Sequence, residues 1–291
     1  MPRTLFFLFV PLLLAGVTEA QGASLSITPH EIKQGEPALV TLDGVSPHDL
    51  QSLSFGVKDV PVFEWKGKPS ALVAVGLNAR TGIALLTAKT AGGGKVQKEV
   101  RIVPRVRIEA PMGIPQKMGG NTPAGANTLV NALARENDLL SHIVVSDAPR
   151  FLGAFRYPLA DITVTDNFGY SRKTGAYTIY HRGTDFAASL RTPVYATNDG
   201  VVRFAGNLLA YGKIVIIDHG ARVASYSLHL DRMDVREGEV VKRGQVIGLS
   251  GDTGYALEPH LHFSVKVGGI SVDPVAFFRL LGEKGVNSAP R

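Results

Sequence analysis

Hydrophobic and polar residues alternate through the first third of the chain, in short runs separated by turn residues. Leu25 and Ile27 alternate with serine and threonine, and the segment 99–102 shows the same period of two. Further apolar runs follow turn residues at 38–42, 71–75 and 83–87. A period of two is typical of strands that bury one face, and frequent turns connect such strands in β-sandwiches. We therefore expect residues 23–104 to form a small β-sandwich.

The segment 105–154 has a different pattern and is expected to connect two domains. Prolines and paired glycines near its start indicate loop structure. Thr122 followed by Pro123 is a typical helix start, because threonine can cap a helix and proline fits its first turn. The apolar residues on one face of this helix are Leu129, Leu133 and Leu140. We expect the helix to end near His142 and to pack this face against one of the domains.

From residue 155 to residue 282 the sequence is again rich in strands and glycines. Asn198-Asp199-Gly200 between two apolar runs is a typical hairpin turn, and the segment 214–217 is a continuous apolar strand. The glycine-spaced stretch 235–249 also resembles the hairpins of lipoyl and biotinyl carrier domains. Such a carrier needs an exposed lysine at the hairpin tip, whereas this tip reads Ser-Gly-Asp-Thr-Gly, which excludes that alternative. We expect a barrel-like or folded antiparallel sheet, followed by a tail at 283–291.

The first 20 residues have the pattern of a cleavable secretory signal. A short basic start is followed by an apolar run from Leu5 to Val17, which ends before the small residue Ala20. A membrane span needs about 20 apolar residues, so the shortness of this run argues against an uncleaved anchor. No cysteine follows the run, which excludes attachment through a lipidated cysteine. We expect export to the periplasm or cell envelope.

The amino-acid composition limits the kinds of site and the binding partners that the chain can have. The chain of 291 residues contains no cysteine, so neither disulfides nor thiolate metal ligands can stabilise it. Its net charge of +6 is compatible either with simple solubility or with attraction to an anionic surface such as a cell wall. The chain has no arginine-rich run with interleaved aromatic residues, and we expect no nucleic-acid partner.

Histidines and one aspartate form three short motifs in the second half of the chain. The motif residues are His181, Asp185, His229, His260 and His262. The last two flank one leucine in a segment with strand periodicity, so both imidazoles would project from one face, about 6.5–7 Å apart. Neutral imidazole together with carboxylate, and without thiolate, is a ligand set that suits catalytic zinc.

These motifs, in this order, resemble the lysostaphin/LytM-type zinc metallopeptidases, which are peptidoglycan endopeptidases. The similarity extends over residues 155–278 and includes Asn-Phe-Gly before the first motif and Val-Asp-Pro after the last. The third motif reads Pro-His-Leu-His-Phe, as it does in that family. The preceding β-sandwich, which we interpret as immunoglobulin-like, and the helical connector are similar to the N-terminal region of some envelope members of the family.

The resemblance implies a role for each motif residue. It assigns His181, Asp185 and His262 as three zinc ligands with a water in the fourth position, the usual arrangement of catalytic zinc. It leaves His229 and His260 unligated near that water. The chain has no His-Glu-x-x-His motif and therefore no motif glutamate to act as base. We expect one of the two unligated histidines to help activate the water and the other to stabilise the oxyanion, without assigning which.

The sequence thus predicts an exported zinc (Zn2+) metalloendopeptidase that hydrolyses peptide cross-links between peptidoglycan stem peptides. For a Gram-negative envelope the resemblance implies the bond from D-alanine to meso-diaminopimelate, and glycine bridges are the alternative. A rival interpretation is a non-catalytic regulator that activates murein amidases, but such regulators have lost metal ligands, and here all five positions are filled. A third interpretation is that the N-terminal sandwich is the functional part of the chain, as a module that binds a partner. The sandwich and helix could also restrain the enzyme by covering its cleft.

Overall fold

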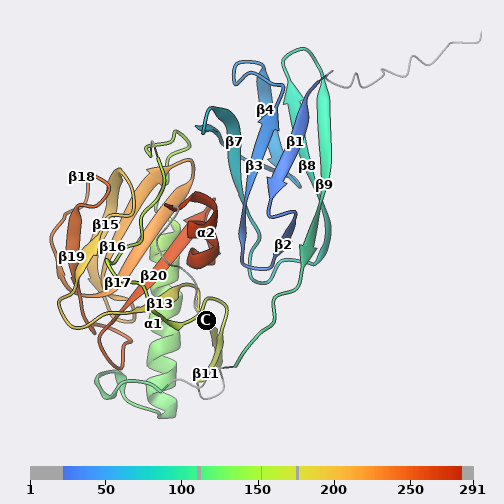
Figure 1. Cartoon of the computed structure of the whole chain (residues 1–291). Coiled ribbons are helices and arrows are strands. Elements are labelled where there is room, and N and C mark those ends of the chain that lie inside the picture. Colours follow the sequence, from blue (N-terminus) through green and yellow to red (C-terminus); the bar gives the residue numbers. More distant parts are fainter. Residues whose placement is uncertain (1–21, 110–112, 152, 175–176, 284–291) are drawn as a thin grey trace, which may run out of the picture.

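The structure, a computed structural model, describes residues 22–109, 113–151, 153–174 and 177–283. Two domains lie side by side and are joined by a connector that contains one long helix (Figure 1). The expected secretory signal, residues 1–20, lies outside the described residues, as does the expected tail beyond residue 283. Within the described part of the chain, no helix has the length and apolar character needed to cross a membrane.

The first domain is a sandwich of two sheets, drawn in blue to cyan in Figure 1. One sheet has the order β1 (Ser24–Thr28), β3 (Pro37–Asp43), β7 (Lys68–Ala74) and β6 (Val62–Trp65). The other has the order β2 (Glu31–Lys33), β9 (Lys95–Val103), β8 (Gly82–Thr90), β4 (Leu50–Phe55) and β5 (Lys58–Asp59). Alternating side chains, Leu25 and Ile27 among them, are buried between the sheets. The predicted β-sandwich is confirmed, and its immunoglobulin-like character stays a prediction.

The connector carries a short 3-10 turn, η1 (Gln116–Met118), and helix α1 (Pro123–Ser141). Oγ1 of Thr122 accepts a hydrogen bond from the backbone N–H of Gly125 at 3.0 Å, which caps the helix as the sequence predicts. Leu129 packs in a buried cluster with Ala210, and Leu140 packs in another with Ile214. The apolar face of α1 therefore lies against the second domain.

The second domain is built on an antiparallel sheet. Its main path has the order β10 (Val164–Asp166), β13 (Thr184–Ala187), β20 (His260–Val267), β17 (Val223–Met233), β16 (Gly212–Gly220), β15 (Gly200–Leu208) and β18 (Val240–Val241). Beside this path, β14 (Pro193–Tyr195) pairs with β19 (Val246–Ser250), β19 pairs with β17, and β21 (Ile270–Val272) pairs with β20. A separate hairpin consists of β11 (Ser171–Thr174) and β12 (Tyr177–Tyr180), and helix α2 (Pro274–Leu281) follows the last strand.

This sheet is open. Its path ends at β10 and β18, and within the described chain these two strands do not pair with each other. No closed barrel forms among the described residues, so of the two expected forms the folded antiparallel sheet is the one present. A mostly β fold with a helical connector is confirmed.

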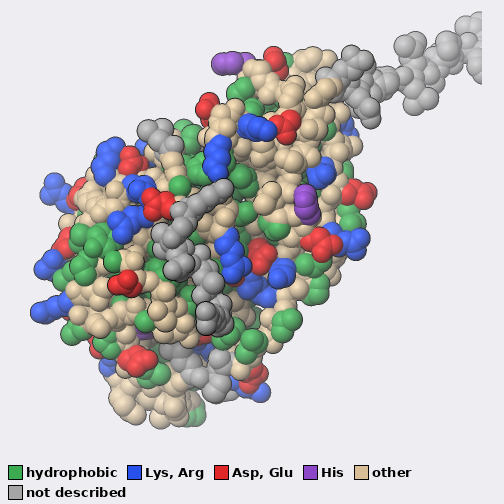
Figure 2. Space-filling view, viewed as in Figure 1, with side chains coloured by type: hydrophobic (Ala, Val, Ile, Leu, Met, Phe, Trp, Pro, Cys, Tyr) green, Lys and Arg blue, Asp and Glu red, His purple; other side chains and the backbone are tan. Residues whose placement is uncertain are grey.

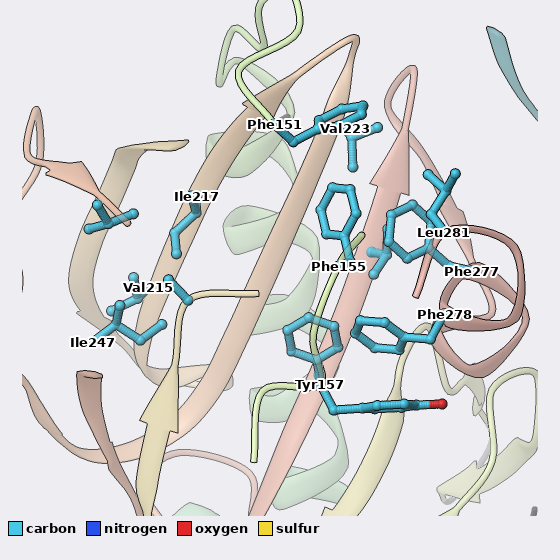
Figure 3. Close-up of a cluster of buried hydrophobic side chains, with 14 of the residues drawn as sticks. Phe151, Phe155, Tyr157, Val215, Ile217, Val223, Ile247, Phe277, Phe278 and Leu281 are labelled. Atoms are coloured by element: carbon cyan, nitrogen blue, oxygen red, sulfur yellow. The ribbon is translucent and has the colours of Figure 1, made fainter. Parts of the chain in front are cut away.

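One face of the sheet encloses an aromatic core with helix α2 (Figure 3). Phe155 packs edge-on against Phe277 with ring centroids 4.9 Å apart, and Tyr157 packs against Phe278 at 4.1 Å. Leu261 of β20 is buried in the same core. Because successive residues of a strand point to opposite faces, the histidines that flank this leucine lie on the other face of the sheet.

The sandwich packs on the core side of this sheet. Phe63 lies edge-on to Phe151 with ring centroids 5.3 Å apart. Arg105 donates to the backbone oxygen of Gln34 at 2.8 Å and to Oδ2 of Asp273 at 2.9 Å, which ties the end of the sandwich to the start of α2. The two domains therefore share buried contacts on the side away from the histidines.

Charged side chains of both signs are interspersed over the face shown in Figure 2. The net charge of +6 is thus not gathered into one patch on that face. This distribution favours the solubility interpretation of the charge for that surface.

Candidate metal centre and active site

Strand pairing brings the first and third motifs together. β13 pairs with β20 in a register that places Asp185 opposite His262, and His181 lies three residues before β13. Gly183 stands where the two segments approach most closely. A Cβ at this position would lie 2.4 Å from Nε2 of His262, so only glycine fits. The close approach of the two segments thus explains why the His-x-Gly-x-Asp motif has a glycine at this position.

Three side-chain atoms converge at this point. Nε2 of His181 lies 3.0 Å from Oδ1 of Asp185 and 2.9 Å from Nδ1 of His262. Nδ1 of His262 lies 2.8 Å from the same carboxylate oxygen. The described residues therefore contain a His-Asp-His group that could hold a metal ion.

The outer nitrogen of each imidazole in this group is engaged in a hydrogen bond. Nδ1–H of His181 donates to the backbone oxygen of Asn167 at 2.8 Å. Oγ of Ser264 donates to the backbone oxygen of Arg182 at 3.0 Å and accepts from Nε2–H of His262 at 2.9 Å. A neutral imidazole has one N–H, so the inner nitrogens present bare lone pairs to each other and to a carboxylate. Such acceptors repel one another unless they share a cation, and this donor set therefore fits a metal.

A buried arginine that sequence analysis missed holds the aspartate in place. Nη2 of Arg172, on β11, donates to Oδ2 of Asp185 at 3.2 Å and also bonds Asp166. The Arg172 side chain is only 8% exposed. Because Arg172 engages Oδ2, Oδ1 of Asp185 is left to face the imidazoles. No motif predicts this contact, since it depends on how the β11–β12 hairpin folds over β13.

The electrostatic balance favours an ionised Asp185 and a neutral His262. Burial by itself would raise the pKa of Asp185, but His181, followed by His262, holds that pKa well below its usual value. Burial lowers the pKa of His262 to about 4, against the opposing effect of Asp185. An ionised carboxylate and neutral imidazoles are the forms in which these groups bind metals.

His229 and His260 lie beside this group, with ring centroids 5.0 Å apart. Nδ1–H of His229 donates to the backbone oxygen of Thr253, and Nδ1–H of His260 to that of Glu258, both at 2.8 Å. In the neutral form of each imidazole, Nε2 therefore carries a bare lone pair, and Nε2 of His260 lies 3.9 Å from Oδ1 of Asp185. Nitrogens in this state can accept a proton from a reacting water.

His229 is also held in a restricted conformation. Its backbone φ is 60°, in the left-handed region that a residue with a side chain seldom adopts. Its backbone N–H donates to the oxygen of Tyr211 at 3.2 Å, which helps to fix this geometry. Burial, followed by the neighbouring His260, holds the pKa of His229 well below its usual value. A neutral His229 is the form that can act as a base.

The histidines line a cleft of about 320 Å³. Helix α1 forms part of its wall through Leu133 and Asn137, and the β11–β12 hairpin forms another part through Ile179 and Tyr180. None of the described sandwich residues lines this cleft. The expectation that the sandwich itself could cover the site is therefore not met by this arrangement, whereas the connector helix does flank it.

Glu136 attaches helix α1 to the turn between β15 and β16, and sequence analysis missed this contact as well. Its carboxylate is buried and accepts hydrogen bonds from the backbone N–H groups of Ala210 at 2.8 Å and Tyr211 at 3.0 Å. The hydroxyl of Tyr211 in turn donates to Oδ1 of Asn137 at 2.9 Å. One carboxylate thus satisfies two backbone donors at the turn between β15 and β16.

Replacing Glu136 by glutamine should destabilise the protein by about 1–3 kcal/mol, because the amide can accept at only one of these two buried N–H groups. Urea unfolding followed by circular dichroism measures the change. Asp138→Asn is the matched control on the same helix, because its side chain is exposed and should shift stability by less than about 0.5 kcal/mol. Equal unfolding midpoints for the two variants would contradict the role of Glu136.

His219, by contrast, is structural. It is fully buried, and its Nδ1–H donates to the backbone oxygen of Asp199 at 2.9 Å. Its Nε2 lies 2.8 Å from Oγ of Ser225. Burial lowers its pKa to about 4. Both ring nitrogens are engaged in the core of the sheet and do not reach the cleft.

The part of the chain that contains this site is similar to known proteins. Residues 179–274 match Peptidase family M23. The chain is 46% identical over 93 residues to the peptidoglycan DD-endopeptidase ShyA of Vibrio cholerae, a match that covers 32% of this chain and 22% of that protein. It is 39% identical over 127 residues to the murein hydrolase activator NlpD of Salmonella dublin, covering 43% of this chain and 32% of that protein. The chain thus spans no more than a third of the length of these relatives.

A solved structure shares the fold. It is a putative peptidase M23 from Pseudomonas aeruginosa, with a TM-score of 0.62 and 23% sequence identity. The match covers 87% of this chain and 96% of that one. Coverage this extensive includes both domains, so the two-domain arrangement belongs to the shared fold.

Proposed function

We propose that this chain, whose residues 179–274 belong to peptidase family M23, is an exported zinc metalloendopeptidase that hydrolyses the peptide cross-links of peptidoglycan. One observation carries the proposal. Two bare imidazole nitrogens and a carboxylate oxygen converge within 3.0 Å of one another, and two further histidines with bare Nε2 atoms lie beside them.

The donor set supports zinc as the metal. His181, Asp185 and His262 would hold it, and two nitrogens with one carboxylate oxygen is a set that leaves one coordination position for a reactant. Zinc bound there supplies a Lewis acid and lowers the pKa of a bound water to about 7. Arg172 and Ser264 keep the ligands oriented through their second atoms.

His229 and His260 would handle the protons. Each presents an unprotonated Nε2 toward the site while a backbone carbonyl holds its Nδ1–H. One of them can accept a proton from the attacking water and later deliver it to the leaving amine. The other, when it carries a proton taken up from solvent, can donate a hydrogen bond to the oxyanion that develops on the scissile carbonyl.

The relatives support a cross-link between stem peptides as the substrate. ShyA is described as a peptidoglycan DD-endopeptidase, and the residues of this chain that match Peptidase family M23 contain the site. We therefore favour the bond from D-alanine to meso-diaminopimelate over a glycine bridge. The pattern of residues 1–20 supports export, which would place the enzyme in the periplasm or cell envelope.

A regulator that activates murein amidases is the second candidate, because NlpD is among the relatives. The five residues that the catalytic role requires are present and arranged around one point, which favours the enzyme. A purified, cross-linked stem-peptide dimer, incubated with the protein alone, tests the choice by mass spectrometry. We expect two monomers without added amidase. An intact dimer, together with faster digestion of sacculi by an added amidase, would favour the regulator.

A further inference from the structure

Two cationic side chains face the cleft beside the metal site. Lys266 lies four residues after His262 on β20, and alternation along the strand places both on the same face of the sheet. Arg182 directly follows His181. Both cations line the cleft that the motif histidines line. Four extended residues, the separation of His262 and Lys266 along the strand, span about 13 Å. A substrate lying along β20 would therefore meet these cations within a few residues of its scissile bond.

Neither cation has an anionic partner in the described part of the chain. The Arg182 side chain forms no ion pair or hydrogen bond there, and the Lys266 ammonium has only the ring of Tyr226, whose centroid lies 4.8 Å away. The carboxylate of the cleft, Asp185, is already engaged by Arg172 and the ligand histidines. The cleft therefore has two positive charges that its own residues do not neutralise.

The two cations also act on each other and on the cleft wall. Burial, followed by the charge of Arg182, lowers the pKa of Lys266. Burial raises the pKa of Tyr211 to about 12, and the charge of Arg182 opposes that rise. Like charges that line the same cleft repel each other, and an anion bound between them removes that repulsion. A carboxylate would form charge-assisted hydrogen bonds with both side chains.

We infer that Arg182 and Lys266 form a subsite for a free carboxylate of the substrate next to the scissile bond. The inference takes its choice of ligand from the proposed function. In a cross-link between D-alanine and meso-diaminopimelate, the carbon that carries the cross-linked amine also carries a free carboxylate. A glycine bridge has no such group. The subsite would therefore select diaminopimelate-type cross-links and reject glycine bridges.

The test measures binding of peptides that the enzyme does not consume. The probe is the tripeptide L-alanyl-γ-D-glutamyl-meso-diaminopimelate, with the D-centre carboxylate either free or amidated, titrated calorimetrically into full-length protein loaded with zinc. We expect amidation to weaken binding to the wild type by about tenfold or more, since a hydrogen bond between charged groups is lost. Amidation at the glutamate of the same peptide is the control and should change binding by less than about twofold.

Variants assign the effect to the two side chains. Arg182→Gln and Lys266→Gln should each weaken binding of the free acid by about tenfold and leave binding of the amide unchanged. Arg182→Lys and Lys266→Arg should restore most of the preference, because the charge is kept. Arg236→Gln removes an exposed positive charge outside the cleft and should behave like the wild type. Unchanged zinc content and unfolding midpoints show that the variants are folded.

Two results would overturn the subsite: equal binding of acid and amide by the wild type, or equal losses for both peptides in the glutamine variants. Hydrolysis of the cross-linked dimer is measured separately on the same preparations. If the wild type distinguishes the two peptides but leaves the dimer intact, the subsite stands and the proposed function fails. If the dimer is cut without any such preference, the proposed function stands and the subsite fails.

Discussion

His262→Ala should lose zinc and activity together, whereas His260→Ala should keep its zinc and lose only turnover. The first change removes one of three converging donor atoms, and the remaining pair cannot hold the metal tightly. The second removes a side chain whose Nε2 lies near that group but outside it, at 3.9 Å from Oδ1 of Asp185. General acid–base groups contribute about 10²–10⁴-fold to rate, so kcat of His260→Ala should fall by that factor.

Metal analysis and steady-state kinetics on the same preparations separate the two outcomes. His229→Ala should resemble His260→Ala, with about one zinc per chain and a similar loss of turnover. His219→Ala is not a suitable control, because that side chain is buried in the sheet. His48 is better placed, since it lies in the sandwich among exposed residues, and His48→Ala should leave zinc and rate unchanged. A zinc-free His260→Ala with a zinc-loaded His262→Ala would show that the two roles are reversed.

Removing the metal should abolish hydrolysis completely and reversibly. A chelator that strips zinc from the purified protein leaves bare nitrogens and a carboxylate in close contact, with no Lewis acid for the carbonyl. Adding about one equivalent of zinc should restore full activity. Because zinc binds only the folded site, zinc at 100 times its dissociation constant should also stabilise the protein by about 2.7 kcal/mol.

Thermal unfolding with and without zinc tests the same claim independently of turnover. The midpoint should rise on addition of zinc and stay unchanged with magnesium, which prefers oxygen ligands. Full activity in chelator, with no zinc detectable in the protein, would exclude the metal assignment.

Local patterns predicted those features of the site that depend on neighbours in the sequence. The alternation around Leu261 predicted that this leucine lies in the core and that the flanking histidines lie on the opposite face. In the structure Leu261 is in the core and the two histidines line the cleft. Thr122 and Pro123 marked the start of α1 correctly. In each case the determining interaction, a strand period or a helix cap, lies within a few residues.

Contacts between distant segments could not be predicted in this way. Arg172 meets Asp185 because the β11–β12 hairpin folds over β13, and Glu136 meets the β15–β16 turn across 74 residues of sequence. Neither residue belongs to a motif, and a buried charge is indistinguishable from an exposed one in a single sequence. For the same reason the sequence could not decide between a barrel-like and a folded open sheet, since closure depends on whether β10 and β18 meet.

Purified sacculi show whether this site hydrolyses the peptide cross-links of peptidoglycan. Full-length wild type and His229→Ala are incubated with sacculi in parallel, and the fragments are identified by mass spectrometry after muramidase digestion. For the wild type, we expect cross-linked dimers to disappear and monomers with intact amide links to the glycan to accumulate. His229→Ala, with its zinc retained, should release about 10²–10⁴-fold less. Undiminished dimers, or stem peptides released from the glycan, would contradict the account.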